Sequence, residues 1–180
     1  MNAIIKEEER CLMDTNKNKL IILIGISGSG KTAFRKKYLQ ENPDTVVICM
    51  DEIRKEYGSV NDQTRNRLVA QIAREQLRSA IEDEHSILWD NTTLSAKYLQ
   101  AVTQQKPANY KMRILYMKRS YDPVSCAESV EDEIDRKVDR SNVPKDVVFR
   151  QAERFLELIS WLKISAPNEI RQNLEEIPVF

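Results

Sequence analysis

The sequence is poor in the residue types that most often bind metals or form redox centres. Its 180 residues include a single histidine, His85, and three cysteines, Cys11, Cys49 and Cys126. No two cysteines have the Cys-x-x-Cys spacing of a zinc or dithiol site, and His85 has no candidate partner nearby in the sequence. We therefore assign none of them a chemical role, and we expect reduced thiols in a cytoplasmic protein.

The sequence also lacks an excess of charge of either sign and a long apolar run. Lys and Arg number 28, as do Asp and Glu, so the formal net charge is zero. This balance excludes a protein that coats nucleic acid through bulk positive charge, although a local basic site is compatible with it. No apolar run approaches the roughly 20 residues of a membrane-spanning helix, so no membrane partner is expected.

Apolar runs alternate with helical patterns along the chain. Strands are predicted over residues 19–24, 45–50, 86–89 and 111–117. Helices are predicted over residues 31–41, about 62–84 and from about 144 onward. This alternation indicates βαβ units, so we predict an α/β fold in which helices flank a parallel sheet of four or five strands. Residues 1–18 then form a polar leader, and residues 19–180 form a single domain.

Glycine is scarce, and three of the four glycines lie in the segment Gly25–Thr32. The segment reads GISGSGKT and matches G-x-x-x-x-G-K-[ST] in full. Glycines let backbone N–H groups turn toward an anion, and the helix that follows directs its positive N-terminus at the same point. We expect a nucleoside triphosphate here, ATP by default, with Lys31 on the β- and γ-phosphates and the Thr32 hydroxyl on Mg²⁺. The expected contacts come from Gly25, Ser27, Gly28, Ser29, Gly30, Lys31 and Thr32.

An acid ends the second predicted strand. Asp51 follows residues 45–50, and ligands of parallel sheets bind where the carboxyl ends of the strands meet. A carboxylate there can accept the proton of an acceptor hydroxyl and orient the attacking oxygen in line with the γ-phosphate. Arg54 shares a helix face with Asp51 if a helical turn begins there, so it is a candidate for binding a phosphate of the acceptor. The alternative is a helix cap at Asp51 and a surface arginine.

Further candidates lie after the third strand and near residue 140. Asp90 suits a carboxylate that supports Mg²⁺, directly or through water, and Asn91 follows as a candidate acceptor contact. Arg136 and Arg140 are four residues apart, within a stretch over about 126–143 that we interpret as a helical lid. Lid arginines can neutralise charge as the γ-phosphoryl group leaves. The alternatives are a helix cap at Asp90 and a solvated helix around Arg136.

With these residues in place, the chain resembles the kinase domain of the bacteriophage 5′-hydroxyl polynucleotide kinase family over about residues 20–155. The resemblance rests on Gly25–Thr32, Asp51-Glu52-Ile53-Arg54, Asp90-Asn91-Thr92, and Arg136 and Arg140 followed by Val143-Pro144. It implies a P-loop kinase fold and ATP- and Mg²⁺-dependent phosphorylation of the 5′-hydroxyl end of RNA or DNA. The acid-rich motif of the family's phosphatase domain is absent, so we expect the kinase activity alone.

The resemblance also implies a role for each matching residue. Asp51 resembles the general base, and Arg54 resembles the residue that binds the 3′-phosphate of the terminal nucleotide. Arg136 resembles the lid arginine nearest the transferred phosphoryl group, with Arg140 beside it. The residues that resemble the acceptor site are Asp90, Asn91, Val143 and Val147.

Two other functions stay open on the sequence. Kinases of small metabolites and zeta-like toxins that phosphorylate nucleotide sugars share the phosphate loop and a strand-end aspartate. A hydroxyl-only acceptor would leave Arg54 without a phosphate to bind. A nucleotide-binding switch or regulatory ATPase would not need Asp51 beside the loop, and the guanine-reading motif Asn-Lys-x-Asp is absent because residues 16–19 lack the acid. The sequence indicates neither the oligomeric state nor a preference for RNA or DNA.

Overall fold

The computed structural model of the protein describes residues 18–58, 64–135 and 143–178. The strands within these ranges are β1 (Lys19–Ile24), β2 (Val46–Ile48), β3 (Ile87–Asp90), β4 (Lys111–Met117) and β5 (Leu174–Ile177). The helices are α2 (Lys31–Glu41), α3 (Met50–Glu56), α4 (Asn66–Glu82), α5 (Ala96–Thr103), the short 3₁₀ helix η1 (Lys118–Tyr121), α6 (Pro123–Asp135), α7 (Lys145–Ile164) and α8 (Asn168–Arg171).

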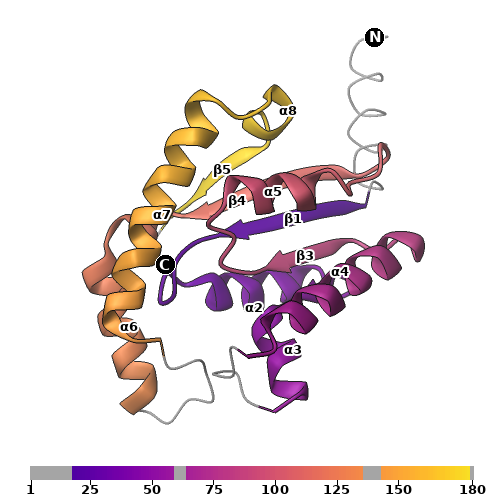
Figure 1. The fold of residues 1–180 in the computed structure, drawn as a ribbon. Helices are drawn as coiled ribbons and strands as arrows, with labels where there is room; N and C mark the ends of the chain where they lie inside the picture. Colours follow the sequence, from indigo (N-terminus) through magenta and orange to yellow (C-terminus); the bar gives the residue numbers. More distant parts are fainter. Residues whose placement is uncertain (1–17, 59–63, 136–142, 179–180) are drawn as a thin grey trace.

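The described strands form one five-stranded parallel sheet of order β2-β3-β1-β4-β5 (Figure 1). This confirms the predicted α/β fold. The central strand β1 pairs with β4 along its whole length, from Lys19 beside Lys111 to Ile24 beside Tyr116. Because all strands are parallel, the carboxyl ends of β1, β2 and β3 lie at the same edge of the sheet. That edge is where the sequence predicted the site.

Helices cover both faces of the sheet. Ile22 of β1 packs into a core cluster with α4, α5 and α7 on one face. Its neighbour Ile21 points to the opposite face and packs with Phe34 and Tyr38 of α2. A strand that is covered on both faces needs apolar side chains at successive positions, which explains the uninterrupted apolar run of β1.

The second strand is shorter than the sequence predicted. β2 ends at Ile48, and the chain begins α3 at Met50 instead of staying extended through residue 50. The cause is Asn91, whose side-chain oxygen accepts a hydrogen bond of 2.8 Å from the Met50 N–H. Its side-chain amide donates to the Ile48 carbonyl at 3.3 Å. These two bonds end the strand and start the helix that carries Asp51.

After α7, the chain adds α8 and the edge strand β5, neither of which the sequence analysis predicted. β5 pairs with β4 from Leu174 beside Ile114 to Ile177 beside Met117. Two consecutive glutamates interrupt its apolar pattern, which removes the usual signal of a strand. Charge instead contributes to its placement, because Arg113 of β4 donates hydrogen bonds of 2.8 and 2.6 Å to the carboxylate of Glu175.

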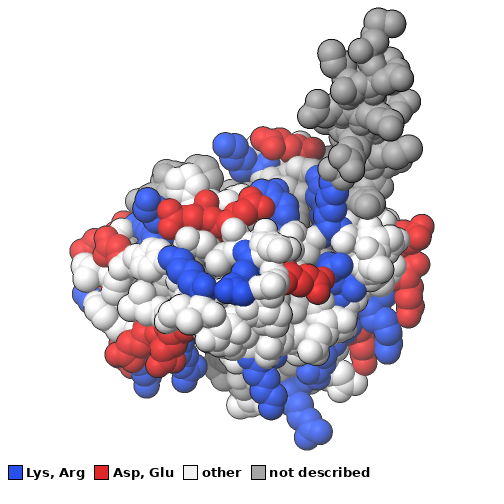
Figure 2. Space-filling view, turned by 90° about the horizontal axis from the view of Figure 1, so that it is seen from above, with Lys and Arg blue, Asp and Glu red and all other residues white. Residues whose placement is uncertain are grey.

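Charged side chains of both signs are interspersed over the face of the molecule seen in Figure 2, where Lys and Arg alternate with Asp and Glu. Within the described ranges, no helix is both long enough and apolar enough to cross a membrane.

Candidate active site

The segment Gly25–Thr32 forms a tight loop between β1 and α2. Gly28 and Gly30 have φ angles of 76° and 95°, which glycine adopts without strain. The backbone N–H and the hydroxyl of Ser29 both donate to the Ile26 carbonyl, at 3.3 and 2.7 Å, and so close the loop. α2 begins directly after Gly30, so its first N–H groups point back at the loop. The backbone therefore has the form of a phosphate-binding site.

Two segments far along the chain hold this loop. The Ser120 hydroxyl of η1 accepts a hydrogen bond of 3.3 Å from the Ile26 N–H. The side-chain oxygen of Gln151, on α7, accepts one of 2.8 Å from the Ser27 N–H. Both contacts are side chain to backbone, so they fix the path of the loop without depending on the side chains that the loop carries.

Lys31 lies against the loop. Its Nζ donates hydrogen bonds of 2.8 Å each to the carbonyl oxygens of Gly25 and Ile26. Burial lowers the pKa of Lys31, while the nearby carboxylates of Asp90 and Asp51 oppose this shift. A phosphate oxygen in the loop would be a stronger partner for the ammonium group than a neutral carbonyl.

Asp51 and Arg54 lie one turn apart on α3 and form an ion pair between Oδ1 and Nη1. The shared helix face that the sequence predicted is therefore present. The side chain of Asp51 is 56% exposed, whereas that of Arg54 is 14% exposed. Asn66, the first residue of α4, accepts two further hydrogen bonds from Arg54, of 3.3 and 3.1 Å. An accessible carboxylate thus stands beside an anchored guanidinium.

Asp90 ends β3 beside the start of the loop and is only 6% exposed. Burial raises the pKa of Asp90. The cations Lys31 and Arg35 oppose the shift, and the acids Asp51 and Glu52 add to it. An ion pair of 3.0 Å joins Asp90 Oδ2 to Arg35 Nη1. Two further carboxylates, Asp51 and Glu52, and the cations Lys31 and Arg35 therefore lie near Asp90 at this end of the sheet.

These residues fit a Mg²⁺ ion that arrives with a nucleotide. The described residues contain no group of three or more His, Cys, Asp or Glu that could hold a metal ion by itself. Mg²⁺ in nucleotide enzymes is commonly held by one or two protein oxygens together with phosphates and water. Thr32 in the first turn of α2 and Asp90 at the end of the neighbouring strand are the residues that could supply those oxygens.

The other residues that the sequence analysis proposed for the site differ in their burial and contacts. Asn91 is 8% exposed, and its side chain is bound to the junction between β2 and α3. Val143 is half-buried and packs on the core, and Val147 is half-buried in the first turn of α7. Arg136 and Arg140 lie outside the described residues, so their role in a lid stays a prediction.

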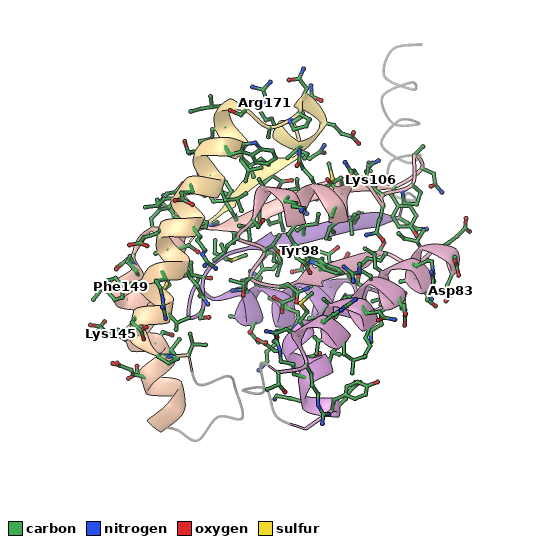
Figure 3. The ribbon with its side chains drawn as sticks, viewed as in Figure 1. Asp83, Tyr98, Lys106, Lys145, Phe149 and Arg171 are labelled. Carbon is green, nitrogen blue, oxygen red and sulfur yellow. The ribbon has the colours of Figure 1, made fainter. Side chains whose placement is uncertain are left out.

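Tyr98 of α5 lies beside the start of α3, and the sequence analysis did not single it out. It lies near the middle of the view in Figure 3, and its hydroxyl is 3.8 Å from the sulfur of Met50, the residue before Asp51. Burial raises the pKa of Tyr98 to about 12, although Arg74 and Arg54 oppose the shift. The phenol therefore stays neutral at physiological pH, and its hydroxyl donates toward the Met50 sulfur.

Arg35 and Gln151 were also missed. Arg35 lies four residues after Lys31 on α2, so the spacing does place the two on one helix face, which is a usable signal. Gln151 is separated from its partner Ser27 by 124 residues. No local pattern in the sequence identifies a contact of that kind.

A parallel sheet whose central strand ends in a phosphate loop defines a P-loop nucleotide-binding domain of the kinase type. A family model of an AAA domain, AAA_33, matches residues 20–158, and the chain belongs to this family. Membership of this P-loop kinase family implies that the protein binds ATP. No curated protein matches the sequence significantly.

Solved structures share the fold. A chain of the Pnkp1/Rnl/Hen1 RNA repair complex is similar with a TM-score of 0.65 and 16% sequence identity, over 80% of this chain and 46% of that chain. The present chain thus spans less than half of that protein's chain. A gluconokinase from Sinorhizobium meliloti 1021 has a TM-score of 0.48 and 14% identity, over 89% of this chain and 82% of the gluconokinase. At these identities the likeness concerns the fold.

Proposed function

We propose that the protein transfers the γ-phosphoryl group of ATP to the 5′-hydroxyl end of RNA or DNA. The observation that carries this proposal is the pair formed by Asp51 and Arg54 on α3. An exposed carboxylate suits the general base for a hydroxyl acceptor. The guanidinium beside it suits an acceptor that carries a phosphate close to that hydroxyl. The terminal nucleotide of a nucleic acid has both groups.

The phosphate loop and Lys31 hold the donor in this proposal. The N–H groups at the start of α2 bind the phosphates of ATP, and Lys31 exchanges its carbonyl partners for phosphate oxygens. Thr32 and Asp90 hold Mg²⁺, which when bound neutralises charge on the phosphates. Arg136 and Arg140 in the proposed lid over residues 126–143 supply further positive charge, because ATP with one Mg²⁺ is still an anion.

Asp51 and Arg54 act on the acceptor. Asp51 accepts the proton of the 5′-hydroxyl and orients its oxygen in line with the γ-phosphate. Arg54 binds the 3′-phosphate of the same nucleotide and so sets the distance between the hydroxyl and the base. Val143 and Val147 line the acceptor channel under the nucleobase. Only the terminal nucleotides need to be held, which agrees with a net charge of zero.

The comparisons support this choice of acceptor without deciding it. The fold is shared with a chain of an RNA repair complex. The four sequence segments that resemble the bacteriophage-type 5′-hydroxyl polynucleotide kinases include both the donor and the acceptor residues. We therefore also propose that residues 19–180 act as a kinase domain of that type.

A kinase of a small metabolite or nucleotide sugar is the second candidate, and one observation favours it. Arg54 is engaged by Asp51 and Asn66. If the acceptor had no phosphate, Arg54 would keep these partners and would simply orient Asp51. The two candidates therefore differ in what Arg54 binds during the reaction.

Transfer of labelled γ-phosphate from ATP to short 5′-hydroxyl RNA and DNA acceptors tests the reaction. We expect transfer by the unaltered protein. Asp51→Asn should bind ATP normally but lower kcat by about 100-fold or more, the scale of a lost general base. Normal turnover by this variant would remove Asp51 from the role. Absence of transfer to every oligonucleotide, with ATP still bound, would favour the small-acceptor candidate.

Two nucleoside acceptors, with and without a 3′-phosphate, test the role of Arg54. Arg54→Ala should raise KM by roughly 10- to 100-fold for the acceptor with the 3′-phosphate, as expected for lost charge-assisted hydrogen bonds. The KM for the acceptor without the phosphate should stay nearly unchanged. Arg67→Ala is the matched control, because Arg67 is an exposed arginine directly after Asn66. An equal effect of Arg54→Ala on both acceptors would assign Arg54 to orienting Asp51.

A further inference from the structure

Arg35 of α2 contacts two acids that belong to two other elements of the site. Its Nη2 lies 2.7 Å from Oε1 of Glu52 on α3, and its Nη1 lies 3.0 Å from Oδ2 of Asp90 at the end of β3. The Arg35 side chain is mostly buried, and Nη1 makes no hydrogen bond of good geometry. The contact with Asp90 is therefore held by charge rather than by an aligned N–H group.

The three elements that meet at Arg35 each carry one part of the proposed reaction. α2 begins with Lys31, one turn before Arg35, and follows the phosphate loop. β3 ends with Asp90, the candidate magnesium residue. On α3, Glu52 directly follows Asp51, the candidate base. One guanidinium thus links the donor side of the site to the acceptor side.

The other attachments of α3 do not provide this link. Asn91 binds the helix at its first residue, Met50, and the buried side chain of Ile53 packs in the core, so these contacts attach α3 to the sheet and not to α2. The contact between Arg54 and Asn66 joins α3 to α4, which belongs to the same acceptor side. Arg35 ties α3 directly to the helix of the phosphate loop through its ion pair with Glu52 and through a side-chain hydrogen bond with Cys49, the residue before α3.

We infer that Arg35 is a positioning residue, which holds Asp51 in line with ATP by tying Glu52 to the phosphate-loop helix. The inference rests on the proposed function in one respect, the assignment of Asp51 as the base. Both Nη atoms of Arg35 face carboxylates, so its proposed effect on the reaction acts through those acids. Since a general base displaced by about 1 Å can cost on the order of 100-fold in rate, such a tie has a measurable effect.

Kinetic constants of four variants test the inference. Arg35→Gln should lower kcat by about 10-fold or more and leave the affinity for a non-hydrolysable ATP analogue within about twofold. Arg35→Lys should be intermediate, because an ammonium group does not reproduce the two-pronged contact of a guanidinium. Glu52→Gln should lower kcat by less, since Glu52 is half-exposed. Glu56→Gln, at the exposed end of α3, is the matched control and should leave kcat unchanged.

A double-variant series separates positioning from a purely structural ion pair. In the Asp51→Asn background, Arg35→Gln should have little further effect on kcat, because no base remains to be positioned. Fully additive effects would overturn the inference. A loss of analogue affinity that parallels the loss of kcat would also overturn it, since Arg35 would then act on the nucleotide site. If Arg35→Gln does not fold, Glu52→Gln serves in the same series.

These readouts do not depend on a nucleic acid acceptor. If the protein phosphorylates a small metabolite instead, the proposed function fails, and the same variants are measured with that acceptor. If no acceptor is found, hydrogen exchange of the amides of residues 50–56 decides the matter. Faster exchange in Arg35→Gln and Glu52→Gln, but not in Glu56→Gln, would support the tie. Unchanged exchange in all three would overturn it.

Discussion

The side-chain oxygen of Gln151 accepts a hydrogen bond of 2.8 Å from the backbone N–H of Ser27. This bond joins the long helix α7 to the phosphate loop, although the two residues are 124 positions apart. The loop therefore does not hold its shape alone. Part of its geometry comes from a helix whose outer side, with Lys145 and Phe149, faces away from the sheet (Figure 3).

Gln151→Ala should weaken both the fold and the binding of ATP. The partly buried Ser27 N–H would lose its acceptor, which typically costs about 1–3 kcal/mol of unfolding free energy. Gln151→Glu keeps an acceptor oxygen but brings a negative charge toward the phosphates. It should therefore recover the stability and bind ATP more weakly than the alanine variant. Urea unfolding and ATP titration measure the two effects, and wild-type behaviour of both variants would show that the bond does not support the loop.

Lys31→Met should affect stability and ATP binding in opposite directions. Because burial lowers the pKa of Lys31, the protonated side chain is less favourable in the folded chain than in the unfolded chain. Its charge therefore lowers the unfolding free energy at neutral pH, and methionine removes that charge while keeping the volume. We expect a ligand-free stability at or above that of the wild type, together with loss of ATP binding by about 100-fold or more. Lys36→Met, on the exposed side of α2, is the control, and retained ATP binding by Lys31→Met would contradict the role of Lys31.

Gly28→Ala should be more damaging than Gly30→Ala. Both residues have positive φ angles, so an alanine is strained at either position. At Gly28, however, a Cβ would lie 2.0 Å from the carbonyl oxygen of Cys126, whereas nothing lies within 4 Å of a Cβ at Gly30. We expect Gly28→Ala to lower the unfolding free energy by about 1–3 kcal/mol more than Gly30→Ala does, as measured by urea unfolding without nucleotide. Equal losses would mean that α6 moves away from the loop at little cost.

The contribution of the edge strand β5 to the unfolding free energy should depend on pH through Glu175. The hydrogen bonds from Arg113 lower the pKa of Glu175, so the ionised carboxylate stabilises the fold above its unfolded pKa of about 4.3. That contribution is lost as the pH falls through the lowered folded value. Because the Arg113–Glu175 pair is partly exposed, Glu175→Gln should lower the unfolding free energy by only about 0.5–1 kcal/mol at pH 7. The difference in unfolding free energy between the variant and the wild type should shrink toward zero near pH 3. Glu157→Gln on α7 is the control, and a difference that persists at low pH would assign the effect to packing.

The parts of the fold that the sequence predicted best are those with a local cause. The strand over residues 19–24 and the helix over 31–41 have the predicted bounds, because a doubly covered strand needs a continuous apolar run and the glycine loop fixes where α2 starts. The strand over residues 111–117 also has the predicted bounds. By contrast, the start of α3 depends on Asn91, and β5 depends on its pairing with β4. These causes lie in other parts of the chain.

The residues of the candidate site also divide into those with a local signal in the sequence and those without one. The loop motif is contiguous, so its residues were identified from the sequence. The sequence also predicted that Asp51 and Arg54 share a helix face, and the structure places them in contact because one turn of helix separates them. The tie through Arg35 and the brace from Gln151 were not found, since each requires the relative placement of separate elements.

The order of the strands has a consequence for how such a protein diversifies. β1, with its phosphate loop, is held between β3 and β4 in the centre of the sheet, whereas β2 is a three-residue edge strand that pairs with β3. The segment from β2 through α4 is therefore a module that can be exchanged or lengthened without breaking the pairings of the central strand. If this segment selects the acceptor, as proposed, the acceptor can change during evolution, or be redesigned by grafting the segment, while the residues that bind ATP stay the same.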